Sequence, residues 1–503
     1  MLPTISRLLA DHARIRPQRE ALICDGRACT FAQLHAEVSK LANAWLDCGL
    51  KKGDKVATVL PNCFELLAAY WAAAASGIVV VPCSPLLRPG GIKTLLQDSG
   101  SKMVIADAAQ ASALNEIRAE LQVEHFVLTG EEKVAGFKNY AQLTTNASTA
   151  APRADIKGDD EYNIMYSSGT TGAPKGIVHT HYIRAMYCAL FAGAWRMTPE
   201  SVALHAGSLV FNGAMLTVMP WMYLGCKYIL HAGFDAANFI KEIESRRVTH
   251  VMLVPAQIIA ILDSPDFSPE KLSSLEMLGS VGAPLHSAHK QRIHKLLPGR
   301  FYELYGVTEG FMTVLDKHDA TRKPDSVGAA AAFTEVRILN ESGATCAPGE
   351  IGEICGRGPL LMPGYHGRPD MTAEAMRGNW LHSGDLGYMD EDGFVFLVDR
   401  KKDMIISGGA NVYPRDIEEV AIQHPRVTEV AVFGVPDAKW GETPVAAVTC
   451  SGELSGEELV EWVNARVDAK FQRLSAAVVL EEFPRNAAGK ILKRELREGW
   501  KGG

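Results

Sequence analysis

Residues 166–176 read YSSGTTGAPKG and form the most informative stretch of this sequence. The stretch follows a strand-like run at 163–166 and precedes a helical pattern that begins near His181. Its glycines let the backbone approach an anion closely, while its hydroxyls and Lys175 add donors and a positive charge. It does not fit the register of a Walker A loop. We therefore expect a polyphosphate-binding loop between a strand and a helix.

Outward from this loop, strand-like and helical runs alternate as far as about residue 325. The apolar runs lie at 56–60, 78–81, 103–105, 123–128, 249–254 and 275–279, with helical patterns such as 31–50 and 235–245 between them. Strands separated by helices are typical of parallel sheets in an α/β protein. From about 325 to 400, short strands with turn signals at 336–339, 349–355 and 393–398 predict a small β-barrel subdomain.

The pattern changes again after the charged run at 399–403. A helix is expected at 414–423, strands at 429–434 and 445–450, and a further helix opened by Ser455 as its N-cap. We therefore predict an α/β fold with a large N-terminal domain over 1–400, which includes the β-barrel subdomain. A small α+β C-terminal domain follows over 401–503. A solvated turn is the alternative interpretation of the charged run.

Composition and charge narrow the classes of protein to consider. The 503 residues are 47% hydrophobic and 22% charged, which is typical of globular domains and excludes disorder or a disulfide-stapled miniprotein. The net charge of −7 excludes nucleic acid as the main partner. Ten cysteines without a C-x-x-C pair predict scattered core thiols in a reducing compartment. The most apolar stretch, 64–83, contains Glu65 and is broken by Gly77 and Pro82, so we expect a cytoplasmic protein without an integral membrane segment.

The segment SSGTTGAPKG resembles the phosphate-binding signature of the adenylate-forming (ANL) superfamily. This superfamily includes acyl- and aryl-CoA synthetases, beetle-type luciferases and peptide-synthetase adenylation domains. Four further segments follow in the family's order: YELYGVTE at 302–309, WLHSGD at 380–385, the run at 399–409 that ends in ISGG, and PRNAAGK at 484–490. The resemblance therefore covers essentially the whole chain.

The resemblance implies a set of residues that contact ATP. Lys490 would reach the carboxylate and the α-phosphate, with Glu309 and Thr308 as its catalytic partners, and Asp385 would accept hydrogen bonds from both ribose hydroxyls. Glu309 and Thr170 would hold Mg²⁺, since hard oxygens suit this cation. The implied ATP-binding residues are Ser167, Ser168, Gly169, Thr170, Thr171, Gly172, Lys175, Tyr305, Gly306, Asp385 and Arg400.

The resemblance also implies an acyl pocket. Its residues are Phe211, Asn212, Gly279, Gly282, Ala283 and Gly310. Many relatives have an aromatic-histidine pair where this chain has Phe211-Asn212. Phe211 would then act as an apolar lid and Asn212 would hydrogen-bond a ring substituent, unless both simply pack. The small residues predict room for a bulky apolar acid, either aromatic, alicyclic or of medium chain length.

A route for coenzyme A is implied by Gly408, Gly409, Trp440 and Arg473. Glycines suit the wall of a narrow tunnel for the pantetheine arm, and Trp440 is similar to a family tryptophan on that route. Lys470 and Arg473 would meet the CoA phosphates. The usual Tyr/Phe-Lys-x-Pro is replaced here by KFQRL at 470–474, which weakens this last assignment.

The predicted function is that of an AMP-forming carboxylic acid–CoA ligase, with Mg²⁺ as cofactor and with ATP and CoA as cosubstrates. The C-terminal domain would rotate about the hinge Lys402, so that Lys490 withdraws and Gly408-Gly409 face the thiol. One alternative is an adenylation enzyme that loads a carrier protein's phosphopantetheine, although no carrier domain is visible and Trp440 favours CoA. Others are a luciferase-like oxygenation and a non-catalytic nucleotide sensor, which would have no reason to keep Lys490.

Two further expectations complete the prediction. His286, His289 and His294 fall in one helical pattern, where a polar helix face is favoured over a metal site. No G-x-S-x-G elbow is present, so serine hydrolase chemistry has no anchor. The oligomeric state stays open, with a homodimer among the expectations.

Overall fold

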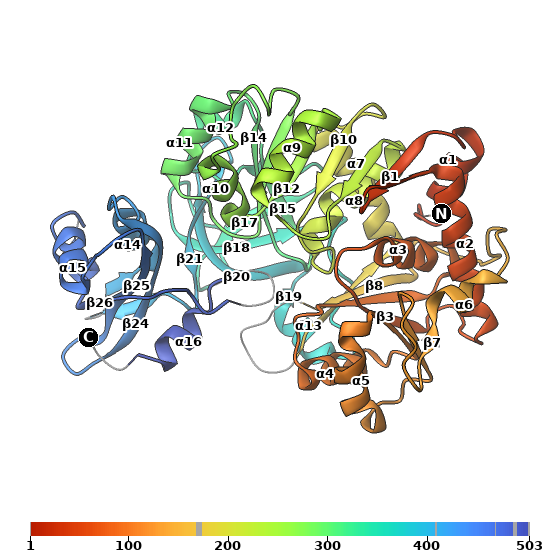
Figure 1. The fold of residues 1–503 in the computed structure, drawn as a ribbon. Helices are drawn as coiled ribbons and strands as arrows, with labels where there is room; N and C mark the ends of the chain where they lie inside the picture. The colour runs from red at the N-terminus through yellow and green to blue at the C-terminus, as the bar shows by residue number, and fades with distance from the viewer. Residues whose placement is uncertain (1, 167–173, 408–409, 468, 486–489, 501–503) are drawn as a thin grey trace.

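The computed structural model describes residues 2–166, 174–407, 410–467, 469–485 and 490–500. Figure 1 shows a large body built from the first 400 residues and a smaller lobe, in blue, that carries the C-terminal elements. Strands β20 and β21 of the large body lie on the side that faces this lobe. The mixed α/β class, the antiparallel half-barrel and the α+β C-terminal part expected from the sequence are confirmed.

A seven-stranded sheet forms around the first α/β units. Its order is β7-β6-β5-β3-β4-β8-β9, and every neighbouring pair is parallel except β8 and β9. The strands are β3 (Lys55–Val59), β4 (Val79–Cys83), β5 (Met103–Ala106), β6 (His125–Leu128), β7 (Lys138–Asn139), β8 (Glu161–Tyr166) and β9 (Gly176–Thr180). Helices α3 (Phe64–Ser76), α4 (Pro89–Ser99), α5 (Ala111–Ile117) and α6 (Tyr140–Thr145) connect them.

A nine-stranded sheet follows, with the order β16-β15-β14-β13-β12-β10-β11-β1-β2. Its strands are β1 (Glu20–Cys24), β2 (Arg27–Thr30), β10 (Val202–His205), β11 (Lys227–Leu230), β12 (His250–Leu253), β13 (Met277–Val281), β14 (Phe301–Gly306), β15 (Met312–Leu315) and β16 (Ala329–Ala330). The six central strands, in the spatial order β1-β11-β10-β12-β13-β14, pair in parallel. Strand β2 at one edge and strands β15 and β16 at the other pair antiparallel. The associated helices are α1 (Leu8–Ile15), α9 (Ala236–Arg246), α10 (Pro255–Asp263), α11 (Ser287–Leu296) and α12 (Asp319–Arg322).

The two sheets share one core. Helices α2 (Phe31–Asp47), α3, α7 (His181–Ala194) and α8 (Met215–Leu224) contribute buried residues to a cluster that contains strand residues from both sheets. Trp71 of α3 and Trp221 of α8 meet edge to face, with ring centroids 6.2 Å apart. The long apolar run at 64–83 is thus a buried helix and a buried strand, as predicted. No helix in the described part of the chain is both long and apolar enough to cross a membrane.

The segment after residue 330 forms a five-stranded antiparallel sheet. Its strands are β17 (Glu335–Leu339), β18 (Gly352–Arg357), β19 (Met376–Arg377), β20 (Trp380–Met389) and β21 (Val395–Arg400), with α13 (Pro369–Ala375) beside them. Strand β20 pairs with β18, β19 and β21. In the β20–β21 register Asp385 lies opposite Arg400, which sets up a charged pair at this end of the sheet.

The C-terminal lobe has its own sheet and core. Its strands are β22 (Ile405–Ser407), β23 (Ala410–Val412), β24 (Val427–Asp437), β25 (Gly441–Cys450) and β26 (Ala476–Val479), covered by α14 (Pro414–Ala421), α15 (Gly456–Asn464) and α16 (Lys493–Glu498). Ser455 caps α15 by accepting from the Glu458 N–H, as expected. The predicted strand at 429–434 was too short, because pairing with β25 carries β24 through Gly434 and Pro436 to the hairpin.

Candidate active site

Asp385 sits in a fixed orientation at the end of the half-barrel sheet. The Tyr305 hydroxyl, from β14, donates to Asp385 Oδ2 over 2.9 Å, and Arg400 Nε lies 3.4 Å from Oδ1. The Asp385 N–H donates to Ser383 Oγ. Burial, and then the charge of Asp385, raise the pKa of Tyr305 well above its usual value, so the hydroxyl keeps its proton and donates. Asp385 is only 9% exposed, and its carboxylate is therefore held as an oriented acceptor.

Thr308 and Glu309 follow β14 and are held by two other parts of the large body. The Tyr365 hydroxyl donates to Glu309 Oε1 over 2.8 Å, and the Met362 N–H donates to the Glu309 carbonyl. His179 Nε2, on β9, lies 2.9 Å from the Thr308 carbonyl oxygen. Burial, followed by the charge of Glu309, raises the pKa of Tyr365. The Glu309 carboxylate is thus kept at a defined place beside β9.

Lys490 approaches this region from the C-terminal lobe. The chain just after it is fixed, because Ile491 bridges to Arg485 and the Leu492 N–H donates to the Pro484 carbonyl. The pKa of Lys490 is lowered to about 8, first by loss of hydration and then by the charge of Arg400, while Asp385 and Glu309 act to raise it. The residue is solvent-exposed, so its loss of hydration is only partial. One lysine near the C-terminus therefore shares an electrostatic environment with the two carboxylates of the large body.

Further cations gather in the same place. The pKa of Lys402 is lowered by burial; Asp403 and Asp385 act to raise it, whereas Arg400 and Lys175 lower it further. Lys402 belongs to the connection between β21 and β22, and Lys175 directly precedes β9. Lys175 Nζ also lies 5.4 Å from the centre of the Tyr365 ring. Lysines and an arginine from three separate segments thus create a local positive region in a net acidic chain, which suits a polyanion.

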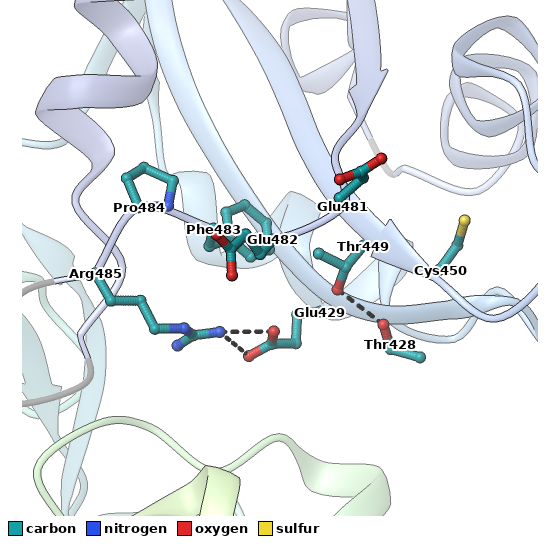
Figure 2. Close-up of a pocket in the computed structure, with 9 residues that line it drawn as sticks. All are labelled: Thr428, Glu429, Thr449, Cys450, Glu481, Glu482, Phe483, Pro484 and Arg485. Atoms are coloured by element: carbon teal, nitrogen blue, oxygen red, sulfur yellow. Dashed lines mark hydrogen bonds and ion pairs between the residues drawn. The ribbon is translucent and has the colours of Figure 1, made fainter.

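The base of the Lys490 segment is anchored within its own lobe. Figure 2 shows Arg485 forming a bidentate ion pair with Glu429 on β24, and both nitrogen–oxygen distances are 2.6 Å. The two residues line a hollow of about 640 Å³, together with Glu481 and Glu482. Three glutamates against one arginine make this hollow unsuited to phosphates, and its described lining contains neither Asp385 nor Lys490. Its contribution is to hold Arg485 against β24.

The residues predicted to line the acyl pocket fall into two groups. Gly213, which follows Asn212, lies beside the end of β13, since a Cβ on Gly213 would be 3.7 Å from Val281 Cγ1. Gly282 and Ala283 follow β13 in an exposed turn, where Gly282 has φ +93°. These positions bring the two predicted pocket segments together.

Two other predicted pocket glycines have a different reason to be small. A Cβ on Gly279 would overlap the side chains of Met252 and Met277, and one on Gly310 would overlap the backbone of Leu360 and Leu361. Gly310 also has φ +142°, a backbone conformation that favours glycine. The inference of free pocket volume at these two positions is therefore corrected, because neighbouring atoms already fill the space.

Two other predicted residues lie on the surface of the C-terminal lobe. Trp440 is 49% exposed, with Lys439 Nζ 4.6 Å from the centre of its ring. Arg473 is also exposed. The predicted phosphate-loop residues Ser167, Ser168, Gly169, Thr170, Thr171 and Gly172, and the predicted CoA-tunnel residues Gly408 and Gly409, lie outside the described residues.

A Glu-Cys-His group beside Asp385 was not anticipated. His382 Nδ1 lies 3.3 Å from Cys355 Sγ and 3.2 Å from Glu353 Oε2, so the three side chains resemble a metal-ligating set. Burial, then Glu353, raise the pKa of Cys355 to about 12, which keeps the thiol protonated. Glu353 Oε1 also accepts from the Gly384 N–H over 3.1 Å. We therefore interpret the group as a hydrogen-bonded support for the turn that presents Asp385.

Comparisons with known proteins agree over the full chain. The AMP-binding enzyme family model matches residues 9–366, and the model of the AMP-binding enzyme C-terminal domain matches residues 416–490. Long-chain-fatty-acid–CoA ligase FadD13 of Mycobacterium tuberculosis is 34% identical over 99% of this chain and 98% of its own. Feruloyl-CoA synthase of an Amycolatopsis species is 35% identical over 96% of each chain.

A solved structure adds information about the arrangement of the parts. ATP-bound MatB from Rhodopseudomonas palustris is 28% identical and superposes with a TM-score of 0.91, covering 100% of this chain and 99% of its own. The apo form of the same protein, with the same identity and coverage, gives a TM-score of 0.81. The arrangement of the present structure is therefore nearer to that of the ATP-bound relative.

Proposed function

Because the chain belongs to the AMP-binding enzyme family and is an AMP-forming ligase of acyl or aryl acids with CoA, we propose that it activates an apolar carboxylic acid. The acid is aromatic, alicyclic or of medium chain length. In the first step a carboxylate oxygen attacks the α-phosphorus of ATP, which gives an acyl-adenylate and pyrophosphate. In the second step the CoA thiol attacks the acyl carbon, so that the thioester forms, AMP leaves and the thiol proton is released.

The observation that supports this reaction most strongly is the position of Lys490. Attack on the α-phosphorus concentrates negative charge on its oxygens, and a cation in a partly dehydrated site stabilises that charge. Lys490 stands within the electrostatic reach of Asp385 and Glu309, the two carboxylates assigned to the ribose and to the phosphate end. Lys490 would thus supply a positive charge at the place where the nucleotide is positioned, as an adenylation step requires.

The donor set at Glu309 fits Mg²⁺. Glu309 presents a carboxylate that Tyr365 keeps in place, and Thr308 adds a hydroxyl nearby, both of them hard oxygen ligands. Glu309 would hold the cation, with Thr170 as the second residue proposed from the motif. When bound, Mg²⁺ neutralises charge on the nucleotide phosphates. Tyr365 does not touch nucleotide in this assignment and is a positioning residue.

Substitution Tyr365→Phe tests that positioning. The variant removes one hydrogen bond to a charged group, worth about 1.5–3 kcal/mol, but leaves the ring against Lys175. We expect the Mg²⁺ concentration for half-maximal adenylation to rise roughly 10- to 100-fold, with the KM of the acid unchanged. Titration of pyrophosphate release against MgCl₂ measures this. An unchanged Mg²⁺ requirement would show that Tyr365 does not act through Glu309.

The pH dependence of adenylation gives a second test. The pKa of Lys490 is about 8, and the ammonium form is present below that value. We therefore expect kcat/KM for ATP to fall as pH rises above about 8, by roughly tenfold per pH unit. In Lys490→Arg the side chain stays charged throughout, so this fall should disappear even if the overall rate is lower. A fall at the same pH in both proteins would assign the titration to another group.

The thioester step requires a second arrangement of the lobes. We place the boundary after Arg400, with Lys402 as the hinge, because the connection 401–404 joins the half-barrel sheet directly to the C-terminal lobe. The exposed Trp440 and Arg473 would meet CoA only after rotation about this connection, and Lys490 would leave the site at the same time. The nearer likeness to the ATP-bound relative supports our proposal that the present arrangement serves the adenylation step.

Exchange of labelled pyrophosphate into ATP, run with a panel of carboxylic acids, tests the function. We expect exchange that depends on acid and does not depend on CoA, followed by thioester formation when CoA is added. Thioester formation only on a carrier protein's phosphopantetheine would favour the carrier-loading enzyme. No exchange with any acid, despite nucleotide binding, would favour a nucleotide sensor.

A further inference from the structure

Arg184 is a fully buried cation whose hydrogen-bond partners in the described part of the chain are neutral side chains. It lies on α7 with none of its surface exposed. A buried guanidinium is normally paired with a carboxylate, because removing it from water is costly. Among the residues that the structure describes, no carboxylate forms an ion pair with Arg184; it contacts only neutral groups. Its charge is therefore not cancelled locally.

The neutral partners of Arg184 connect two parts of the molecule. Arg184 Nε donates to Asn163 Oδ1 and Nη1 donates to Asn212 Oδ1, both over 2.9 Å. Asn163 then turns its nitrogen toward His179 Nδ1, at 3.5 Å, which leaves His179 Nε2–H to donate to the Thr308 carbonyl. Burial, and then the charge of Arg184, lower the pKa of His179, in agreement with a neutral ring. One hydrogen-bonded chain thus runs from Thr308 to Asn212.

The orientation of the Asn212 amide is fixed by these contacts. Arg184 can only donate, so the atom that faces it must be the amide oxygen. The amide nitrogen accordingly donates to the Tyr187 hydroxyl over 2.9 Å. Arg184 and Tyr187 are fully buried whereas Asn212 is half-buried. The nitrogen carries a second hydrogen, and Asn212 keeps part of its surface accessible.

We propose that the acid carries an oxygen atom that accepts a hydrogen bond from Asn212, on the part of the acyl group remote from the reacting carboxylate. The oxygen belongs to a hydroxyl, ether, carbonyl or second carboxylate group. Arg184 is the positioning residue that holds the Asn212 oxygen inward, and its uncancelled charge favours substituents with negative charge. This inference rests on the proposed function, in which Asn212 lines the acyl pocket, and it refines that function: the acyl group is apolar except for this one oxygen-bearing group.

Matched pairs of acids test the inference by pyrophosphate exchange. Suitable pairs are benzoate with 4-hydroxybenzoate, cinnamate with 4-hydroxycinnamate, and hexanoate with hexanedioate. We expect at least one oxygen-bearing member to exceed its plain partner about tenfold or more in kcat/KM, since a pocket built around a polar group rejects an analogue that lacks it. Plain acids that match or exceed their partners in all three pairs would overturn the inference while leaving acid activation itself intact.

Two variants test which residues cause the preference for oxygen-bearing acids. Asn212→Leu removes the donor at a half-buried position, and Arg184→Met removes the charge with a side chain of similar length. Each is expected to reduce the ratio between paired acids to about one, because kcat/KM for the oxygen-bearing acid falls more than that for the plain acid. Thr217→Val is the control. Thr217, on the neighbouring helix α8, forms a buried hydrogen bond with Tyr228 on β11, and its replacement should keep the ratio.

Folding is checked by thermal unfolding of each variant. If Arg184→Met does not fold, the Asn212→Leu variant alone tests the inference. An undiminished ratio of kcat/KM between the paired acids in that variant would overturn the assignment of Asn212. Absence of exchange with every acid in the wild-type protein is a different result, because it would overturn the proposed function and this inference with it.

Discussion

Lys490→Ala is expected to lose about 10²- to 10³-fold in the rate of acyl-adenylate formation, the range found for removal of one preorganised electrostatic group. The lysine is expected to matter only while charge develops on the α-phosphate. The variant should therefore retain most of its ability to form thioester from a supplied acyl-adenylate and CoA. Single-turnover assays of the two half-reactions measure the two rates separately.

Two controls accompany this variant. Lys490→Arg keeps the charge with a different shape and should lose less than Lys490→Ala. Lys241→Ala removes an exposed lysine of α9 in the large body and should leave both half-reactions unchanged. Equal losses in adenylation and in thioester formation for Lys490→Ala would contradict the view that the lysine serves the first step alone.

Asp385→Ala is expected to lower kcat/KM for ATP by roughly 10²- to 10⁴-fold. Two hydrogen bonds from ribose hydroxyls to an ionised acceptor are worth about 1.5–3 kcal/mol each, and 1.4 kcal/mol corresponds to tenfold. The Tyr305 hydroxyl and the Arg400 guanidinium, which now face Asp385, would also lose their partner. The loss should appear mainly in the KM of ATP, as measured by initial rates of pyrophosphate release.

The use of 2′-deoxy-ATP shows whether this loss arises at the ribose. The wild-type protein should discriminate against 2′-deoxy-ATP, whereas Asp385→Ala should treat it almost like ATP. Asp159→Ala, at an exposed position in the connection before β8, is a matched control that should keep the discrimination. Full discrimination in Asp385→Ala would place the ribose elsewhere.

Local signals were enough to predict much of the fold. The helical pattern at 31–50 became α2, and the apolar runs at 56–60 and 78–81 became the adjacent parallel strands β3 and β4. Strand ends were less predictable because hydrogen bonding to a partner overrides residue preference. Pro436 illustrates this, since it lies within β24 opposite Glu442 on β25.

Candidate site residues could be proposed from the sequence only where they lie in a recognisable motif. Asp385, Glu309 and Lys490 lie in quoted motifs, and the structure brings their charges together. Tyr365 and Arg184 lie outside the motif residues assigned to the site, and each gains its role from a partner far away in the sequence. Tyr365 is 56 positions from Glu309, and Arg184 is 28 positions from Asn212. Only the folded chain reveals such pairs.

The predicted pocket glycines were difficult to interpret for a different reason, because glycine occurs at positions with unrelated structural requirements. Gly310 leaves room for the backbone at Leu360 and Leu361, whereas Gly282 supplies a turn with φ +93°. The sequence alone does not distinguish a glycine that opens a pocket from one that permits close packing. The acyl pocket was therefore the least well predicted part of the site.

The transfer of a labelled oxygen tests the central claim, that the carboxylate attacks the α-phosphorus of ATP. The enzyme is incubated with ATP, CoA and an acid that it accepts, labelled with ¹⁸O in its carboxylate, and the products are analysed by mass spectrometry. The account predicts one ¹⁸O atom in AMP and none in pyrophosphate, because the bridging oxygen of the acyl-adenylate stays with phosphorus when the thiol attacks. Label in pyrophosphate with unlabelled AMP would show attack on the β-phosphorus, and labelled inorganic phosphate with ADP would show attack on the γ-phosphorus. Either result would contradict the account.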